Sequence, residues 1–207
     1  MRVPWVLASR NAGKLVELRA IFASKGIAVV DLRGAGVGVE ATEEDIESFD
    51  SFEENALAKV RYFSARLPGR IIVADDSGLS VDALGGAPGV RSKRWSGSSK
   101  HGGALDAENN AALVAAIRSH ARRDARFICV AAWTDGRIEM TARGEVMGRI
   151  VEDPVGTNGF GYDPHVFVGE LGMTMAEASI EEKQRVSHRA RAFLGLVDGL
   201  KSRALID

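Results

Sequence analysis

Apolar and polar positions along the first 50 residues indicate a strand, a loop, a helix and a second strand. Residues 3–8 form an apolar run, residues 9–14 (SRNAGK) are mostly polar, and the apolar side chains within 15–22 recur at helical spacing. Residues 27–31 again have the composition of a strand. The stretch 32–50 is acidic and glycine-rich without clear periodicity, so we expect it to be irregular.

A helix and a strand follow, and the strand ends at a pair of acids. Ser51 and Glu54 have the spacing of a capping box, with an apolar stripe after them at helical spacing. The apolar run 71–74 predicts a strand that stops at Asp75 and Asp76. Neighbouring carboxylates at the end of a buried strand gather negative charge, which needs a metal ion, a proton or a cationic ligand. An Asp-rich turn of purely structural use is the alternative.

Two long strands and two further helices complete the pattern. Residues 105–120 predict an Ala-rich helix, and the β-type runs 126–134 and 137–146 are joined by an Asp-Gly pair, which is a strong hairpin signal. Residues 166–168 predict a short strand, and 187–200 a final helix. We expect a mixed α/β fold, since a hairpin between helices argues against a purely parallel doubly wound sheet.

Composition places the chain among soluble globular proteins. Its 207 residues, 45% of them hydrophobic and 27% charged, are enough for a buried core, and we expect residues 1–207 to form a single domain. The net charge of −1 argues against a nucleic-acid polymer as partner and favours small anions. Neither a signal peptide nor a membrane span is expected, so the predicted location is cytoplasmic. The single Cys129 reads as a small buried hydrophobe.

The loop 9–14 is a candidate phosphate site. Gly13 and the backbone N–H groups of the following helix would cradle an anion, and Lys14 would neutralise it. The spacing is not that of a Walker A loop, and a solvated Lys14 is the alternative.

The start of the last helix is a second candidate. Ser187 is a good N-cap, and His188 and Arg189 follow it at once, with Lys183 just before. Cations in a first turn oppose the helix dipole unless an anion binds there. A tolerated basic surface is the alternative.

The loop GFGYDP carries two aromatic rings on a glycine framework. Phe160 and Tyr162 suit stacking on a planar base, and Asp163 is an acceptor for ring N–H groups. Both rings as core residues beneath a loop is the alternative.

Taken together, five motifs resemble one enzyme family. SRNAGK, SFEENALAK, ADDSGLSVDALGGAPGVRSKRWSG, GFGYDP and EEKQRVSHRARA, in this order, are similar to the inosine triphosphate pyrophosphatase family. The resemblance implies a two-lobed ITPase-like α/β fold with a long central mixed β-sheet, a substrate groove between the lobes, and a homodimer. It also implies hydrolysis of non-canonical purine nucleoside triphosphates (ITP, dITP, XTP) to the monophosphate and pyrophosphate, with Mg²⁺ as cofactor.

The resemblance also implies roles for particular residues. Asp76 would be the general base and a metal ligand, Glu47 the other Mg²⁺ ligand, and Asp75 a supporting carboxylate, with Lys59 a weaker phosphate candidate. The residues expected to bind substrate are Ser9, Arg10, Asn11, Ala12, Gly13, Lys14, Ser77, Phe160, Gly161, Tyr162, Asp163, Lys183, His188 and Arg189. A keto oxygen at the purine 6-position would accept from His188 or Arg189, where adenine presents a donor.

Two departures from the family pattern stand out. Arg10 occupies a position that usually has a small residue, where it would add a phosphate contact or crowd the loop, and Ser48-Phe49 replace a common Thr-Gly. Glu43, Glu44 and Asp45 lie close to Glu47 in the sequence, and one of them as the metal ligand is the alternative. A related Maf-like pyrophosphatase and a nucleotide-binding regulator without turnover remain the competing functions.

Overall fold

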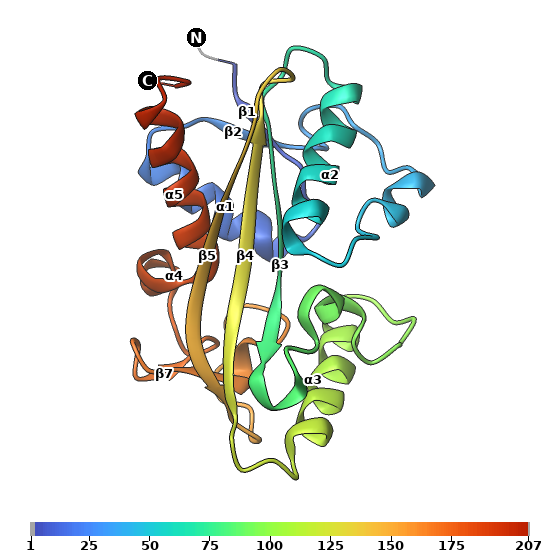
Figure 1. Cartoon of the computed structure of the whole chain (residues 1–207), viewed down its shortest axis with the longest axis vertical. Coiled ribbons are helices and arrows are strands. Elements are labelled where there is room, and N and C mark those ends of the chain that lie inside the picture. The colour runs from blue at the N-terminus through green and yellow to red at the C-terminus, as the bar shows by residue number, and fades with distance from the viewer. Residues whose placement is uncertain (1–2, 207) are drawn as a thin grey trace. The chain divides into compact units, whose positions relative to one another are not determined.

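The computed structural model of the chain describes residues 3–206 (Figure 1). The strands are β1 (Trp5–Leu7), β2 (Val29–Asp31), β3 (Ile72–Val81), β4 (Asp124–Thr134), β5 (Glu139–Ile150), β6 (Val166–Val168) and β7 (Met173–Thr174). The α-helices are α1 (Ala12–Ser24), α2 (Phe52–Arg66), α3 (Gly103–Ile117), α4 (Ile180–Val186) and α5 (His188–Ser202). Short 3-10 helices are η1 (Ala41–Asp45), η2 (Asp82–Leu84), η3 (Gly89–Arg94) and η4 (Asp163–His165).

The strands form a seven-stranded sheet in the order β2-β1-β3-β4-β5-β6-β7. β1 pairs in parallel with both β2 and β3, whereas β6 is antiparallel to β5 and β7. Strands β4 and β5 are joined by the predicted Asp-Gly turn, in which the Asp135 carboxylate accepts from the N–H groups of Arg137 and Ile138. The prediction of a mixed α/β fold is therefore confirmed.

The chain separates into two compact units. Unit 1 consists of Met1–Asp76, Cys129–Gly144 and Arg189–Asp207, and unit 2 of Ser77–Ile128 and Glu145–His188. Strands β3, β4 and β5 each have residues in both units, so each unit is built from several separate stretches of the sequence.

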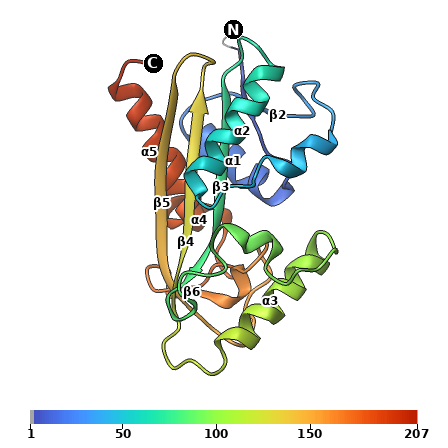
Figure 2. The same ribbon diagram turned by 45° about the vertical axis from the view of Figure 1, so that its right-hand side comes forward.

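Helices α1 and α5 bury one face of the strands of unit 1. Leu7 of β1 and Trp133 of β4 pack there against Phe22 of α1 and Phe193 of α5, all of them buried. The rings of Phe22 and Phe193 meet edge to face, 5.5 Å apart at 74°. Figures 1 and 2 show α2 on the side of these strands away from α5. Side chains that alternate along a strand of unit 1 therefore face different helices.

Unit 2 has its own core beneath α3. Leu113 and Ile117 of this helix pack with Leu79 of β3, Val166 of β6 and the ring of Tyr162, and all five side chains are buried.

Among the helices that the structure describes, none combines the length and the apolar character needed to cross a membrane.

Three local predictions were wrong, each for a physical reason. β3 continues from Ile72 through both acids to Val81, because Asp75 and Asp76 find buried partners and the strand can carry them. The stretch 32–50 contains η1 rather than being wholly irregular. Helix α4 was missed, although Ser179 and Glu182 form a capping box at its start and this spacing is visible in the sequence.

Candidate active site

The adjacent carboxylates of β3 point to opposite faces of the sheet in unit 1. Successive side chains of a strand alternate, so Asp75 shares the face of Val73, which lies in the core with α1 and α5. Asp76 lies on the other face, where its partners come from α2. The two carboxylates therefore lie on different faces of the strand, and each has a cation beside it, as buried charges of this kind require.

Asp75 lies in a buried cluster with two cations. Its Oδ2 atom is 2.9 Å from Lys14 Nζ and 3.6 Å from Arg189 Nε, and the Cys129 thiol donates to it at 3.8 Å. Burial opposes the charge on this carboxylate, but Lys14 and Arg189 outweigh it and hold the pKa of Asp75 well below its ordinary value. Burial beside Asp75 raises the pKa of Cys129, so the thiol stays protonated and inert, as expected of a buried cysteine.

Arg189 is held by two carboxylates of the chain. Its Nη1 donates to Glu17 of α1, and the guanidinium also contacts Asp75. Burial disfavours its charge, but Glu17 and Asp75 raise the pKa of Arg189 above its ordinary value. The anions that offset this cation in the first turn of α5 thus include carboxylates of the protein itself.

Asp76 is a buried carboxylate with an amide and an ammonium group beside it. Asn55 Nδ2 donates to Asp76 Oδ2 at 2.9 Å, and Lys59 Nζ lies 3.8 Å from Asp76 Oδ1. Asn55 and Lys59 are four residues apart in α2 and so share a face of the helix. Burial is the largest influence and raises the pKa of Asp76, an effect that Lys59 only partly offsets. A raised pKa makes this carboxylate a stronger base than an exposed one.

Lys59 joins Asp76 to Glu47. Its Nζ forms an ion pair with Glu47 Oε1 and donates to the backbone oxygen of Asp75 at 2.5 Å. Burial opposes the charge, yet Glu47 and Asp76 raise the pKa of Lys59, which therefore remains an ammonium ion. Lys59 thus brings Glu47, the expected metal ligand before α2, into the same set of contacts as Asp76.

The carboxylates beside the Lys59 ammonium suit a divalent cation that binds together with a nucleotide. No group of three or more His, Cys, Asp and Glu side chains in residues 3–206 is arranged to hold a metal by itself. Glu47 and Asp76 nevertheless both lie beside one cation, Lys59. Mg²⁺ often takes only one or two protein carboxylates and completes its shell with water and phosphate oxygens. The pair therefore fits Mg²⁺ bound together with phosphates.

The loop 9–14 forms the start of α1 at the carboxyl end of β1. Asn11 is the N-cap, and its Oδ1 accepts from the N–H of Lys14 at 2.9 Å, while Ser9 Oγ accepts from the N–H of Asn11. Ala12 and Gly13 are the first two helical residues, and N–H groups at these positions lack an acceptor within the helix. This geometry is typical of a phosphate site and keeps the predicted roles of these residues open.

In unit 2 the glycine-rich loop is pinned by an ion pair. Asp163 Oδ2 lies 2.6 Å from Lys183 Nζ of α4 and accepts from the N–H of Phe160, and both members of the pair are buried. Gly159 has φ +83°, and a Cβ there would lie 2.0 Å from Asp163 Oδ2, so only glycine fits. Helix α3 holds the same loop, because its Asp106 accepts from the N–H of Gly161.

The two aromatic residues of this loop have different surroundings. Tyr162 lies in the core of unit 2, its hydroxyl donates to the Ser92 carbonyl at 2.7 Å, and burial raises its pKa. Phe160 is only half-buried. The prediction of two stacking rings is corrected for Tyr162, whose side chain is a core residue, and Phe160 remains the candidate platform.

His188 is the last residue of unit 2 and begins α5. Its ring stacks on Phe127, with centroids 4.9 Å apart and an interplanar angle of 16°. The imidazole is buried and fixed in orientation by this contact, as a group that reads a base edge must be. Ser77 follows Asp76 within β3 and is half-buried.

The model of the Ham1 family matches residues 5–199. The chain belongs to the Ham1 family. This confirms the relationship that the five motifs predicted. Relatives of this chain include the dITP/XTP pyrophosphatase of Nitrosomonas europaea, 46% identical over 202 residues, with 94% of this chain and 93% of that protein covered. The dITP/XTP pyrophosphatase of Ralstonia nicotianae is 44% identical over 199 residues, covering 95% and 96%. The solved HAM1 protein of Coxiella burnetii has a TM-score of 0.80 and 33% identity, covering 97% of this chain and 100% of that one.

At the departure Ser48-Phe49, the backbone of the segment is bonded to Asn55. Asn55 Oδ1 accepts from the Phe49 N–H at 3.0 Å, and Asn55 Nδ2 donates to the Phe49 carbonyl at 3.2 Å. Only the backbone of Phe49 takes part, and its side chain is 45% exposed. Asn55 thus connects this segment to Asp76, a role that its place in SFEENALAK, four residues before Lys59, signals in the sequence.

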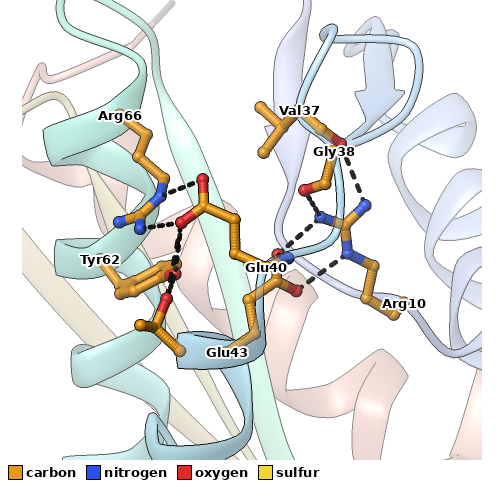
Figure 3. Close-up of polar contacts among 8 residues, drawn as sticks. Arg10, Val37, Gly38, Glu40, Glu43, Tyr62 and Arg66 are labelled. Carbon is orange, nitrogen blue, oxygen red and sulfur yellow. Dashed lines mark hydrogen bonds and ion pairs between the residues drawn. The ribbon is translucent and has the colours of Figure 1, made fainter.

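The departure at Arg10 has a different outcome. Its guanidinium binds the Glu43 carboxylate and the carbonyl oxygens of Val37 and Gly38 (Figure 3). Neither predicted effect, an added phosphate contact or a crowded loop, describes this arrangement. The partners lie 27 to 33 residues away, beyond the reach of local sequence patterns.

Proposed function

We propose that this Ham1-family chain is a Mg²⁺-dependent nucleoside triphosphate pyrophosphatase. Its substrates would be ITP, dITP and XTP, hydrolysed to the monophosphate and pyrophosphate, so that the nucleotide pool is cleared of non-canonical purines. The observation that carries the proposal is the buried Asp76 with Glu47 about one cation, in a chain whose relatives are named dITP/XTP pyrophosphatases. The resemblance further leads us to propose a homodimer that acts in the cytoplasm.

In this reaction Asp76 accepts a proton from the attacking water. Its raised pKa and burial suit a general base, and Asn55 fixes the orientation of its carboxylate. Glu47 and Asp76 would hold Mg²⁺, which when bound neutralises phosphate charge and lowers the pKa of a coordinated water.

The phosphates are assigned to the loop 9–14 and the start of α1. Backbone N–H groups of Ala12 and Gly13 would donate to phosphate oxygens, and the positive end of the helix dipole favours their charge. Lys14 adds an ammonium charge that Asp75 holds in place at 2.9 Å.

The nucleoside is assigned to residues of unit 2. Phe160 would stack on the base, and the buried pair of Asp163 and Lys183 would keep the loop that carries Phe160 in shape. His188 would donate to the 6-keto oxygen that ITP and XTP share and ATP lacks.

A panel of nucleoside triphosphates with Mg²⁺ tests the proposal directly. ITP, dITP and XTP should each give one monophosphate and one pyrophosphate per turnover, and ATP much less, because adenine has an amino group in place of the 6-keto oxygen. Preference for pyrimidine triphosphates would instead indicate the Maf-like activity. Binding of ITP without release of pyrophosphate would indicate a nucleotide sensor.

Replacing Glu47 with Gln should raise the Mg²⁺ concentration for half-maximal rate by about tenfold. The amide removes one of two anionic donors while preserving side-chain volume. Steady-state rates at saturating ITP over a Mg²⁺ series measure the shift. Asp45→Asn, an exposed acid two residues earlier, is the control and should leave the midpoint unchanged. An unchanged midpoint in Glu47→Gln would assign the ligand to another acid.

Replacing His188 with Ala should reduce kcat/KM for ITP and XTP more than for ATP. Loss of a donor matched to the keto oxygen leaves a buried acceptor unpaired, which costs about 1–3 kcal/mol, or roughly five- to 150-fold in the ITP to ATP ratio. His165→Ala is the matched control, because His165 is also 6% exposed and lies in unit 2, bonded to the Val151 carbonyl. The control should not change the ratio. Equal losses of kcat/KM for ITP and ATP in His188→Ala would instead assign recognition of the base to Arg189 or to the backbone of the loop GFGYDP.

A further inference from the structure

Arg10 connects the loop 9–14 to a distant segment of unit 1. Its Nε and Nη2 donate to the two oxygens of Glu43 at 3.0 and 2.8 Å, and further bonds reach the carbonyls of Val37 at 3.2 Å and Gly38 at 2.5 Å (Figure 3). The fork geometry of the guanidinium matches the Glu43 carboxylate. The Glu43 hydrogen bonds raise the pKa of Arg10 and lower that of Glu43, so both remain charged at neutral pH.

The same segment is anchored to α2 on its other side. Glu40 pairs with Arg66 at 2.5 Å and accepts from the Tyr62 hydroxyl, and Thr42 shares a 2.5 Å hydrogen bond with Tyr62. The guanidinium of Arg66 lies 3.6 Å from the centroid of the Tyr62 ring. Glu43 Oε1 also accepts from the N–H of Glu40, so the two anchors of η1 are joined to each other (Figure 3).

Glu47 follows Glu43 by four residues and reaches Lys59 in the same helix α2. Arg10 therefore holds the start of segment 37–47 through Val37 and Gly38. The segment ends at Glu47, whose carboxylate pairs with Lys59, and Lys59 also lies beside Asp76. A chain held at both ends keeps less conformational freedom, so Glu47 is ordered before any ligand binds.

We propose that Arg10 is a positioning residue that, through Glu43, fixes the segment carrying Glu47 and couples it to the loop 9–14. Arg10 acts on the metal through Glu43 and Glu47, not by touching phosphate, since four of its five N–H donors are already used within the protein. The inference rests on the proposed function in taking Glu47 as a ligand and loop 9–14 as the phosphate site.

Titration with Mn²⁺ alone, followed by electron paramagnetic resonance, tests the proposal without turnover. Arg10→Ala and Glu43→Gln should each weaken Mn²⁺ binding by about tenfold, the low end for groups that orient a metal ligand. The double variant should be no weaker than either single one, because both changes break the same link. Additive losses would mean that the two residues act separately and would overturn the link.

Arg61→Ala is the matched control. Arg61 of α2 also makes two hydrogen bonds to one carboxylate, at 2.8 and 2.6 Å, but that carboxylate belongs to Glu139 of β5 rather than to segment 37–47. It should leave Mn²⁺ affinity unchanged. Hydrogen–deuterium exchange of residues 37–47 should rise in Arg10→Ala and not in Arg61→Ala. Unaltered exchange there would overturn the proposal whether or not the protein binds metal.

Kinetics separate this role from a phosphate contact. Arg10→Ala should raise the Mg²⁺ requirement with ITP while KM for ITP at saturating Mg²⁺ stays within about twofold, whereas direct phosphate binding would raise that KM by tenfold or more. A tenfold rise in the KM for ITP, together with an unchanged Mn²⁺ affinity, would contradict the proposal. The proposed function alone would be overturned if the wild-type protein binds Mn²⁺ and Arg10→Ala shows the predicted rise in exchange, but the wild type hydrolyses no triphosphate.

Discussion

Replacing Asp76 with Asn should lower kcat for ITP by about 10²–10⁴-fold, the usual contribution of a general base, and leave the fold intact. The amide keeps the side-chain volume and an oxygen for Asn55 but cannot take a proton from water. Because burial already disfavours the charge on Asp76, its loss should not lower the free energy of unfolding. Steady-state kinetics and urea unfolding of the purified variant measure both effects.

Asp31→Asn is a suitable control for this experiment. Asp31 is the last residue of the parallel strand β2 in unit 1, where it pairs with Arg19 and accepts from the Gly34 N–H. It should retain the wild-type rate. An Asp76→Asn protein with near wild-type kcat and an unchanged circular dichroism spectrum would exclude Asp76 as the base.

Asp75→Asn should instead destabilise the protein, by about 3–5 kcal/mol in urea unfolding, the cost of removing one partner from a buried ion pair. Lys14 and Arg189 would lose the buried charge that both of them contact, although Arg189 keeps Glu17. Asp198→Asn, which alters an exposed pair with Lys25, should change stability by less than about 0.5 kcal/mol. Equal stability of Asp75→Asn and Asp76→Asn would contradict the separate surroundings assigned to them.

The pH dependence of this difference has a definite sign. The folded-state pKa of Asp75 is lowered, so its contribution to stability is present above the unfolded pKa of about 4 and is lost as pH falls below it. The difference in unfolding free energy between wild type and Asp75→Asn should therefore be constant from pH 5 to 7 and shrink below pH 4.

Much of the fold could be predicted because it follows local rules. Periodicity located β1, α1 and α2, the Asp-Gly pair located the turn between β4 and β5, and the order of the motifs indicated the family. The error at β3 came from ending the strand at Asp75. Once the strand continues, its alternation alone separates Asp75 from Asp76, so the two faces were within reach of the sequence.

Other parts of the site depend on contacts between distant residues. The sequence shows that Arg10 is unusual but contains no local signal that it meets Glu43, 33 residues away. Asp163 likewise has a sequence context that suits base recognition, while its partner Lys183 lies in the unpredicted helix α4. Tertiary packing determines such pairs, and polar residues in glycine-rich loops carry little information about it.

Lys59 also affects the stability of the protein when no metal ion is bound. Two carboxylates brought together by folding would ordinarily repel, and many metal sites depend on their ion for that reason. Here the ammonium of Lys59 belongs to the chain and lies against both Glu47 and Asp76. The fold thus carries its own counter-ion. On the proposed function, loss of magnesium should therefore stop hydrolysis without unfolding the protein, and activity should return when the ion is added back.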